Sequence, residues 1–118
     1  MTKKMNKAIA GFHILSILSV VDNNFDPREG LIIVKYLKET FPPLPINFDD
    51  EIEVLSSLVK NDYLQHFENC LVEFYKDSTQ EERTAFLKFA VELIKADKVI
   101  TDSENVYLNL IYDRWDFE

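Results

Sequence analysis

The sequence predicts an all-α protein, a bundle of about six helices in one domain covering residues 1–118. The 118-residue chain contains only two Gly and four Pro, too few for the many turns of a β protein. Its hydrophobic content of 47% is enough for one core. Most segments also repeat apolar residues at the spacing of a helix face.

Charge and cysteine content exclude some functions. The net charge of −8 leaves no basic face for phosphates, so we expect no nucleic-acid partner. Cys70 is the single cysteine of the chain and cannot form an internal disulfide. We therefore expect a reducing compartment.

The first helix is expected within AIAGFHILSILSVV, residues 8–21. With Lys3, Lys4 and Lys7 before it, this run resembles a secretory signal, but no small-x-small cleavage site follows Val21. It is also too short to span a bilayer. We expect a core helix that is apolar on most sides, and no membrane insertion.

A second helix is predicted to start after the loop that begins at Asp22. Asp26 is a good N-cap, Pro27 suits the first helical position, and Glu29 occupies the third position of a capping box. The prolines of FPPLP, residues 41–45, end this helix.

Two further helices are predicted in the central part of the chain. The first covers roughly residues 48–60 behind the cap Asn47. The second covers roughly residues 63–76. Their expected apolar positions are Ile52, Leu55, Leu58 and Val59 in the first, and Leu64, Phe67, Leu71, Phe74 and Tyr75 in the second.

The last two helices have their own start signals. Ser78 and Glu81 are spaced as a capping box, which predicts a helix over roughly residues 79–96. Thr101 and Glu104 have the same spacing ahead of the final helix. The expected core positions of the earlier helix are Phe86, Leu87, Phe89, Ala90, Leu93 and Ile94. We expect the aromatic residues of the C-terminal segment to complete the core, with a partner-binding patch as the alternative.

The chain contains an internal repeat of these start signals. Residues 18–33 align without a gap on residues 93–108, which places Asp22 on Asp97 and Glu29 on Glu104. In both copies an apolar helix ends in Asp, and a capped helix with Glu at its third position follows. The repeat predicts two helix-loop-helix hairpins, packed together at the termini and flanking a central helix pair.

The repeated acids allow two interpretations. An EF-hand is excluded, because the glycine and the twelfth-position Glu that it requires fall on Pro27 and Ile33. If the hairpins are related by a pseudo-twofold axis, four carboxylates converge on a hard cation such as Ca²⁺ or Mg²⁺. Otherwise each acid serves its own loop or cap. The four candidate ligands are Asp22, Glu29, Asp97 and Glu104.

The repeated pattern Asp-x-x-apolar-[Asp/Thr]-x-x-Glu resembles the signature of the tellurite-resistance TerB-like family. The likeness covers roughly residues 8–41 and 83–115. The usual motif has Gly after each Asp, where this chain has Asn23 and Lys98, so the resemblance is to a divergent member. It implies a non-catalytic bacterial cytoplasmic domain, linked to stress or metal-related systems, whose acidic residues hold a metal ion.

Two functional hypotheses follow. One is a protein-interaction module, linked to stress and binding a divalent ion at its acidic loops; the other is a small metal-dependent enzyme that uses the same carboxylates. His13 and His66 are expected to be structural, and Cys70, four residues after His66, has nothing to complete a zinc site with it. The sequence offers no nucleophile elbow or phosphate loop, so a non-catalytic module with a protein partner is favoured.

Overall fold

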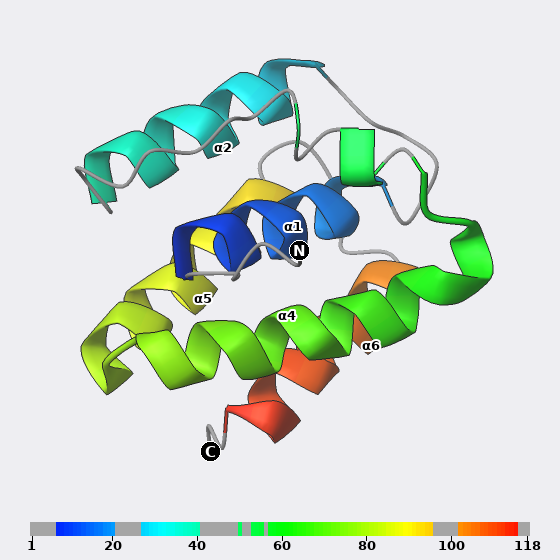
Figure 1. The fold of residues 1–118 in the computed structure, drawn as a ribbon. Coiled ribbons are helices and arrows are strands. Elements are labelled where there is room, and N and C mark those ends of the chain that lie inside the picture. Colours follow the sequence, from blue (N-terminus) through cyan, green and yellow to red (C-terminus); the bar gives the residue numbers. More distant parts are fainter. Residues whose placement is uncertain are drawn as a thin grey trace.

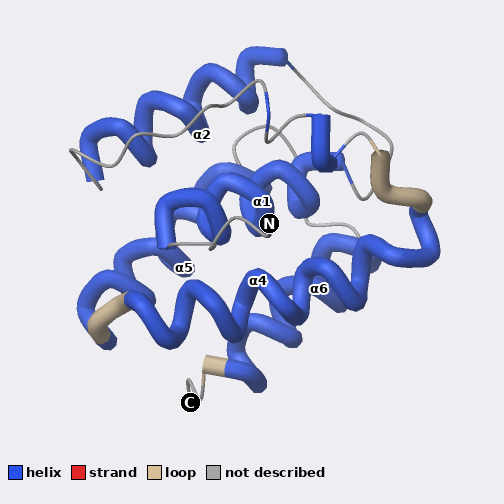
Figure 2. Tube along the Cα trace, viewed as in Figure 1, coloured by secondary structure: helices blue, strands red, loops and turns tan. Residues whose placement is uncertain are grey.

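The computed structural model describes residues 7–20, 27–40, 50, 53–55, 57–95 and 102–115. Its elements, in chain order, are α1 (Lys7–Val20), α2 (Pro27–Thr40), the short 3-10 helix η1 (Lys60–Asp62), α4 (Tyr63–Asp77), α5 (Gln80–Lys95) and α6 (Asp102–Arg114). No strand occurs among these residues (Figures 1 and 2). The predicted all-α helical bundle is confirmed.

Helix α1 is the central element of the bundle. Its residues from Ala8 to Leu15 are all buried, as expected for a helix that is apolar on most sides. It packs most extensively against α4 and also contacts α2 and α5 (Figure 1). A Cβ added at Gly11 would lie 3.0 Å from Phe86 and 3.3 Å from Leu37, so the absence of a side chain allows this close approach.

Helix α4 lies against both α1 and α6 (Figure 1). Its buried side is made by four residues one or two helical turns apart, namely Phe67, Cys70, Leu71 and Phe74. The predicted arrangement has the two terminal hairpins packed against each other, with the central helix pair against both. In the structure α1 and α6 cover the apolar side of α4, and the other side of α4 is exposed.

An aromatic cluster closes the core near the C-terminal end of α6. The ring of Trp115 stacks on Phe74 at a centroid distance of 4.9 Å, and Phe86 lies 4.6 Å from Phe74. The indole N–H of Trp115 donates a hydrogen bond to the carbonyl oxygen of Leu71 at 2.9 Å. The prediction that C-terminal aromatic residues complete the core is confirmed for Trp115, which is buried.

The turn between α4 and α5 corrects the predicted capping box by one residue. The Glu82 carboxylate accepts a hydrogen bond from the Thr79 backbone N–H at 2.9 Å, and the Thr79 hydroxyl accepts one from the Glu82 N–H at 3.2 Å. The hydroxyl of Ser78 instead donates to the carbonyl oxygen of Phe74. The prediction of Ser78 and Glu81 is therefore wrong, because Ser78 completes the end of α4.

The start of α1 is joined to this region by an ion pair. The Lys7 ammonium lies 2.7 Å from the Glu82 carboxylate, and this hydrogen bond lowers the pKa of Glu82. Both side chains are partly exposed. The contact positions the first turn of α1 beside the first turn of α5, although it adds little stability in solvent.

The predicted helix over residues 48–60 is shorter than expected. Of its described residues, 50 and 53–55 are helical, and residues 57–59 are not. Leu55 packs against the core, whereas Val59 is 60% exposed. The apolar face therefore does not continue to Val59.

In the described residues, every helix falls short of the length and apolar content that a membrane crossing requires.

Candidate metal centre

Two of the four predicted carboxylate ligands, Glu29 and Glu104, lie within the described residues. Asp22 and Asp97 lie outside the described residues. Glu29 is the third residue of α2, although its side chain is not described, and Glu104 is buried in the first turn of α6. The convergence of these acids, like the internal repeat, stays a prediction.

The helix starts beside these acids agree with the sequence. Helix α2 begins at Pro27 and α6 begins at Asp102, in each case one residue after the predicted cap. The caps themselves, Asp26 and Thr101, lie outside the described residues. Glu29 and Glu104 therefore occupy the third helical position that a capping box requires.

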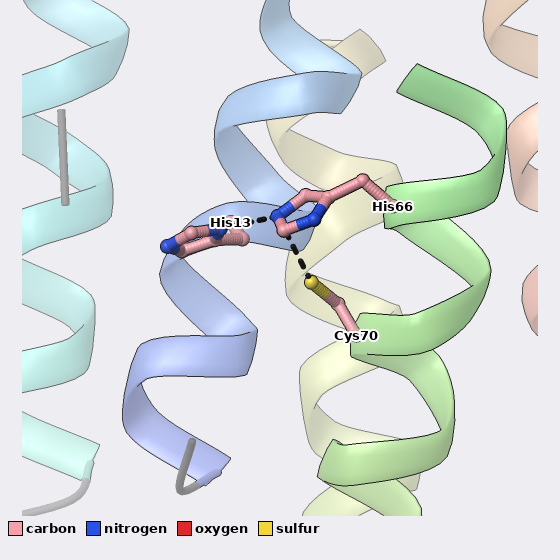
Figure 3. A group of neighbouring side chains, drawn as sticks. All are labelled: His13, His66 and Cys70. Atoms are coloured by element: carbon pink, nitrogen blue, oxygen red, sulfur yellow. Dashed lines mark hydrogen bonds between the residues drawn. The ribbon is translucent and has the colours of Figure 1, made fainter. Parts of the chain in front are cut away.

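A second group of potential ligands begins on the buried side of α4. His66 and Cys70 are four residues apart, so they lie one above the other on the same face of the helix. The Cys70 Sγ is 3.6 Å from the His66 Nε2. Both side chains are directed towards α1 (Figure 3).

Helix α1 supplies the third member of this group. The Nδ1 atom of His13 lies 2.7 Å from the Nε2 atom of His66, a hydrogen-bond distance (Figure 3). The two ring centroids are 4.9 Å apart and the rings are tilted by 43°. The cluster of His13, His66 and Cys70 therefore joins the two helices that pack most extensively.

The separations in this cluster are close to those of a coordination sphere. One ligand atom from each residue can be chosen so that all three lie within 4.8 Å of one another. Zinc–nitrogen and zinc–sulfur bonds place neighbouring ligand atoms roughly 3.3–3.8 Å apart. The 3.6 Å contact between Cys70 and His66 matches that range, and the 2.7 Å contact between the rings requires a shift of less than about 1 Å.

The cluster is shielded from solvent on most sides. His13 is 1% exposed and Cys70 is fully buried, whereas His66 is half-buried. The ring of Phe12 approaches His13 edge-on, with centroids 6.2 Å apart. The hydrogen bonds among the three residues partly offset the cost of burying their polar atoms.

The ligand atoms determine which ions this site can bind. Two imidazole nitrogens and one sulfur favour transition metals, whereas Ca²⁺ and Mg²⁺ prefer oxygen ligands. Within the described residues, the group of potential ligands holds no Asp or Glu. The cluster therefore lacks the oxygen ligands that the expected Ca²⁺ or Mg²⁺ site requires.

The sequence did not indicate that His13 lies near His66 and Cys70, and the structural role expected for both histidines stays a prediction. His13 lies beside His66 although the two residues are 53 positions apart in the sequence. The available signals were the four-residue spacing of His66 and Cys70, and a histidine within an otherwise apolar helix. Neither signal indicates that α1 and α4 present these faces to each other.

Comparisons of this chain with protein-family models, curated proteins and solved structures found no match. The resemblance to the TerB-like family therefore stays a prediction that rests on the residues quoted for it.

Proposed function

We propose that the protein is a non-catalytic helical module that binds one transition-metal ion between α1 and α4. The observation that carries this proposal is the convergence of His13, His66 and Cys70 from two helices. Among the described residues the only other buried polar side chains are those of Ser19 and Glu104, so three such donors side by side are uncommon in this core. An ion held by all three would connect α1 to α4 by coordination bonds.

Burial supports a binding role over a catalytic one. A catalytic metal site needs a position that a substrate can reach. Two of the three ligands, His13 and Cys70, are buried, so access is limited to the side of His66. The alternative of a small metal-dependent enzyme uses the four carboxylates Asp22, Glu29, Asp97 and Glu104, of which Asp22 and Asp97 lie outside the described residues.

We expect the metal-free protein to gain thermal stability from Zn²⁺, Co²⁺ or Cu⁺, and not from Ca²⁺ or Mg²⁺. A ligand that binds only the folded state adds about 2.7 kcal/mol when its concentration is a hundredfold above its Kd. Melting monitored by circular dichroism, with each ion in turn, measures the shift. Because Cys70 supplies the sulfur ligand, Cys70→Ala should lose the shift.

The variants Asp22→Asn and Asp97→Asn distinguish this centre from the predicted carboxylate site. They should retain the response to Zn²⁺, because neither residue belongs to the cluster. Stabilisation by Ca²⁺ or Mg²⁺ that disappears in both variants would contradict the proposal and support the acidic loops instead.

The outer face of α2 supports a second role, in which the module contacts a protein partner. Helix α2 packs on the core through Ile33 and Leu37, while Leu31 is 73% exposed and Ile32 is 47% exposed. Lys35 is exposed on the same helix, in a chain whose net charge is −8. An apolar pair beside a cation favours a partner surface that is apolar and acidic. A role in bacterial stress and a cytoplasmic location rest on the family resemblance alone.

We expect a photo-crosslinking amino acid at position 31 to form a defined adduct in cells. Lys35→Glu should reduce its yield, because it places like charge against an acidic partner. The same crosslinker at position 106 is the matched control, since Val106 is 53% exposed on α6. Adducts of the same mass and yield from both positions would contradict a specific contact at α2.

A further inference from the structure

We propose that the ion bound by His13, His66 and Cys70 is a monovalent thiophilic metal, Cu⁺. This inference rests on the proposed metal-binding function and names the ion class for the same site. It follows from the number of ligands, the charge that they enclose and the softness of the sulfur donor.

The number of ligands is the first argument. Structural zinc sites are almost always four-coordinate, with all four ligands from the protein. Among the described residues the group contributes three ligand atoms, two nitrogens and one sulfur. With only the three ligands that the described residues supply, Zn²⁺ would take a fourth ligand, such as water, from the side of the half-buried His66. A soft monovalent ion with three strong donors avoids this requirement.

The enclosed charge is the second argument. A metal-bound cysteine is a thiolate with one negative charge, and a metal-bound histidine is neutral. Zn²⁺ at this site would leave a net charge of about +1 in a region where His13 is 1% exposed and Cys70 is fully buried. Cu⁺ with the same three ligands forms a neutral unit. Among the described residues the group of potential ligands includes no carboxylate, whose negative charge would favour a divalent ion.

The donor chemistry agrees with this choice. Soft thiolate ligands favour Cu⁺ and Zn²⁺ over hard ions, and imidazole binds copper well. The residues next to the ligands along both helices, Phe12 and Phe67, are buried aromatic side chains. Such surroundings strengthen the interaction between a soft cation and its thiolate.

Competition measurements test the inference directly. Under anaerobic, reducing conditions the protein is titrated against the chromophoric Cu⁺ chelator bicinchoninate, and separately with Zn²⁺ against a chromophoric zinc chelator. We expect one Cu⁺ per chain, bound at least about tenfold more tightly than Zn²⁺. X-ray absorption at the copper edge should show three ligands, two nitrogens and one sulfur. Ag⁺, which does not change oxidation state, should bind with the same stoichiometry.

Variants separate this site from other sulfur atoms of the chain, those of Met1 and Met5. Cys70→Ser and His66→Gln each keep both methionines and should lower Cu⁺ affinity by about 100-fold or more. His66 is half-buried, so the glutamine is accommodated even if serine at position 70 unfolds the chain.

Three results would overturn the inference. Zn²⁺ bound as tightly as Cu⁺ would leave the metal-binding function in place and exclude a monovalent site. Cu⁺ affinity that is unchanged in His66→Gln would show that the thiol acts without the imidazoles. Failure of every ion to bind would remove the metal-binding function as well.

Discussion

Phe74→Ala should lower the free energy of unfolding by about 3–5 kcal/mol, because it removes a fully buried ring from the centre of the core. Phe74 stacks on Trp115 and lies 4.6 Å from Phe86 between ring centroids. Its ring also faces Gly11, where an added Cβ would be 3.4 Å away. The substitution therefore leaves a cavity where α1, α4, α5 and the end of α6 meet. Urea denaturation of both proteins measures the loss.

Val72→Ala is the matched control for this prediction. Val72 lies two residues earlier on α4 and is 45% exposed, so its truncation should change stability by only about 0.5 kcal/mol. Equally small losses in the two variants would show that Phe74 is not the centre of the core. A large loss in both would mean that the outer side of α4 is covered by an element that the described residues do not include.

The sequence predicted the helices well because their signals are local. The apolar spacing of Phe67, Leu71 and Phe74 places one face of α4 in the core, and all three are fully buried. The starts of α2 and α6 follow from cap chemistry and were found at the expected residues. The start of α5 was missed by one residue. Ser78 with Glu81 and Thr79 with Glu82 satisfy the same pattern, and only the structure shows that Ser78 serves α4.

The His–Cys cluster was not predictable for a different reason. The spacing of apolar residues shows which face of a helix is buried. It does not show which other helix packs on that face. The pairing of His13 with His66 depends on α4 lying against α1, a contact between segments that are 53 residues apart. Sequence reasoning was instead directed to the acids, because Asp22 and Asp97 occur in a visible repeat.

His13→Leu should abolish the metal response and leave a folded protein. The variant exchanges one nitrogen ligand for an apolar side chain of similar size and removes the hydrogen bond to His66, which should cost about 1–3 kcal/mol. His66 keeps the neighbouring Cys70 sulfur at 3.6 Å and is half-buried, so water can replace part of the lost hydrogen bond. With metal at a hundredfold excess over the Kd, the wild type should gain about 2.7 kcal/mol and the variant should gain nothing.

Ile14→Val on the same helix should keep the metal response that His13→Leu loses. Ile14 is fully buried, so loss of one methyl group should lower metal-free stability by about 0.5–1.5 kcal/mol. It leaves the three ligand atoms in place, and the full rise in melting temperature with metal should remain. The two substitutions thus separate packing of α1 from coordination by α1. If His13→Leu kept the metal-induced rise, His13 would not be a ligand, and the two remaining donors on α4 would not hold α1 by coordination.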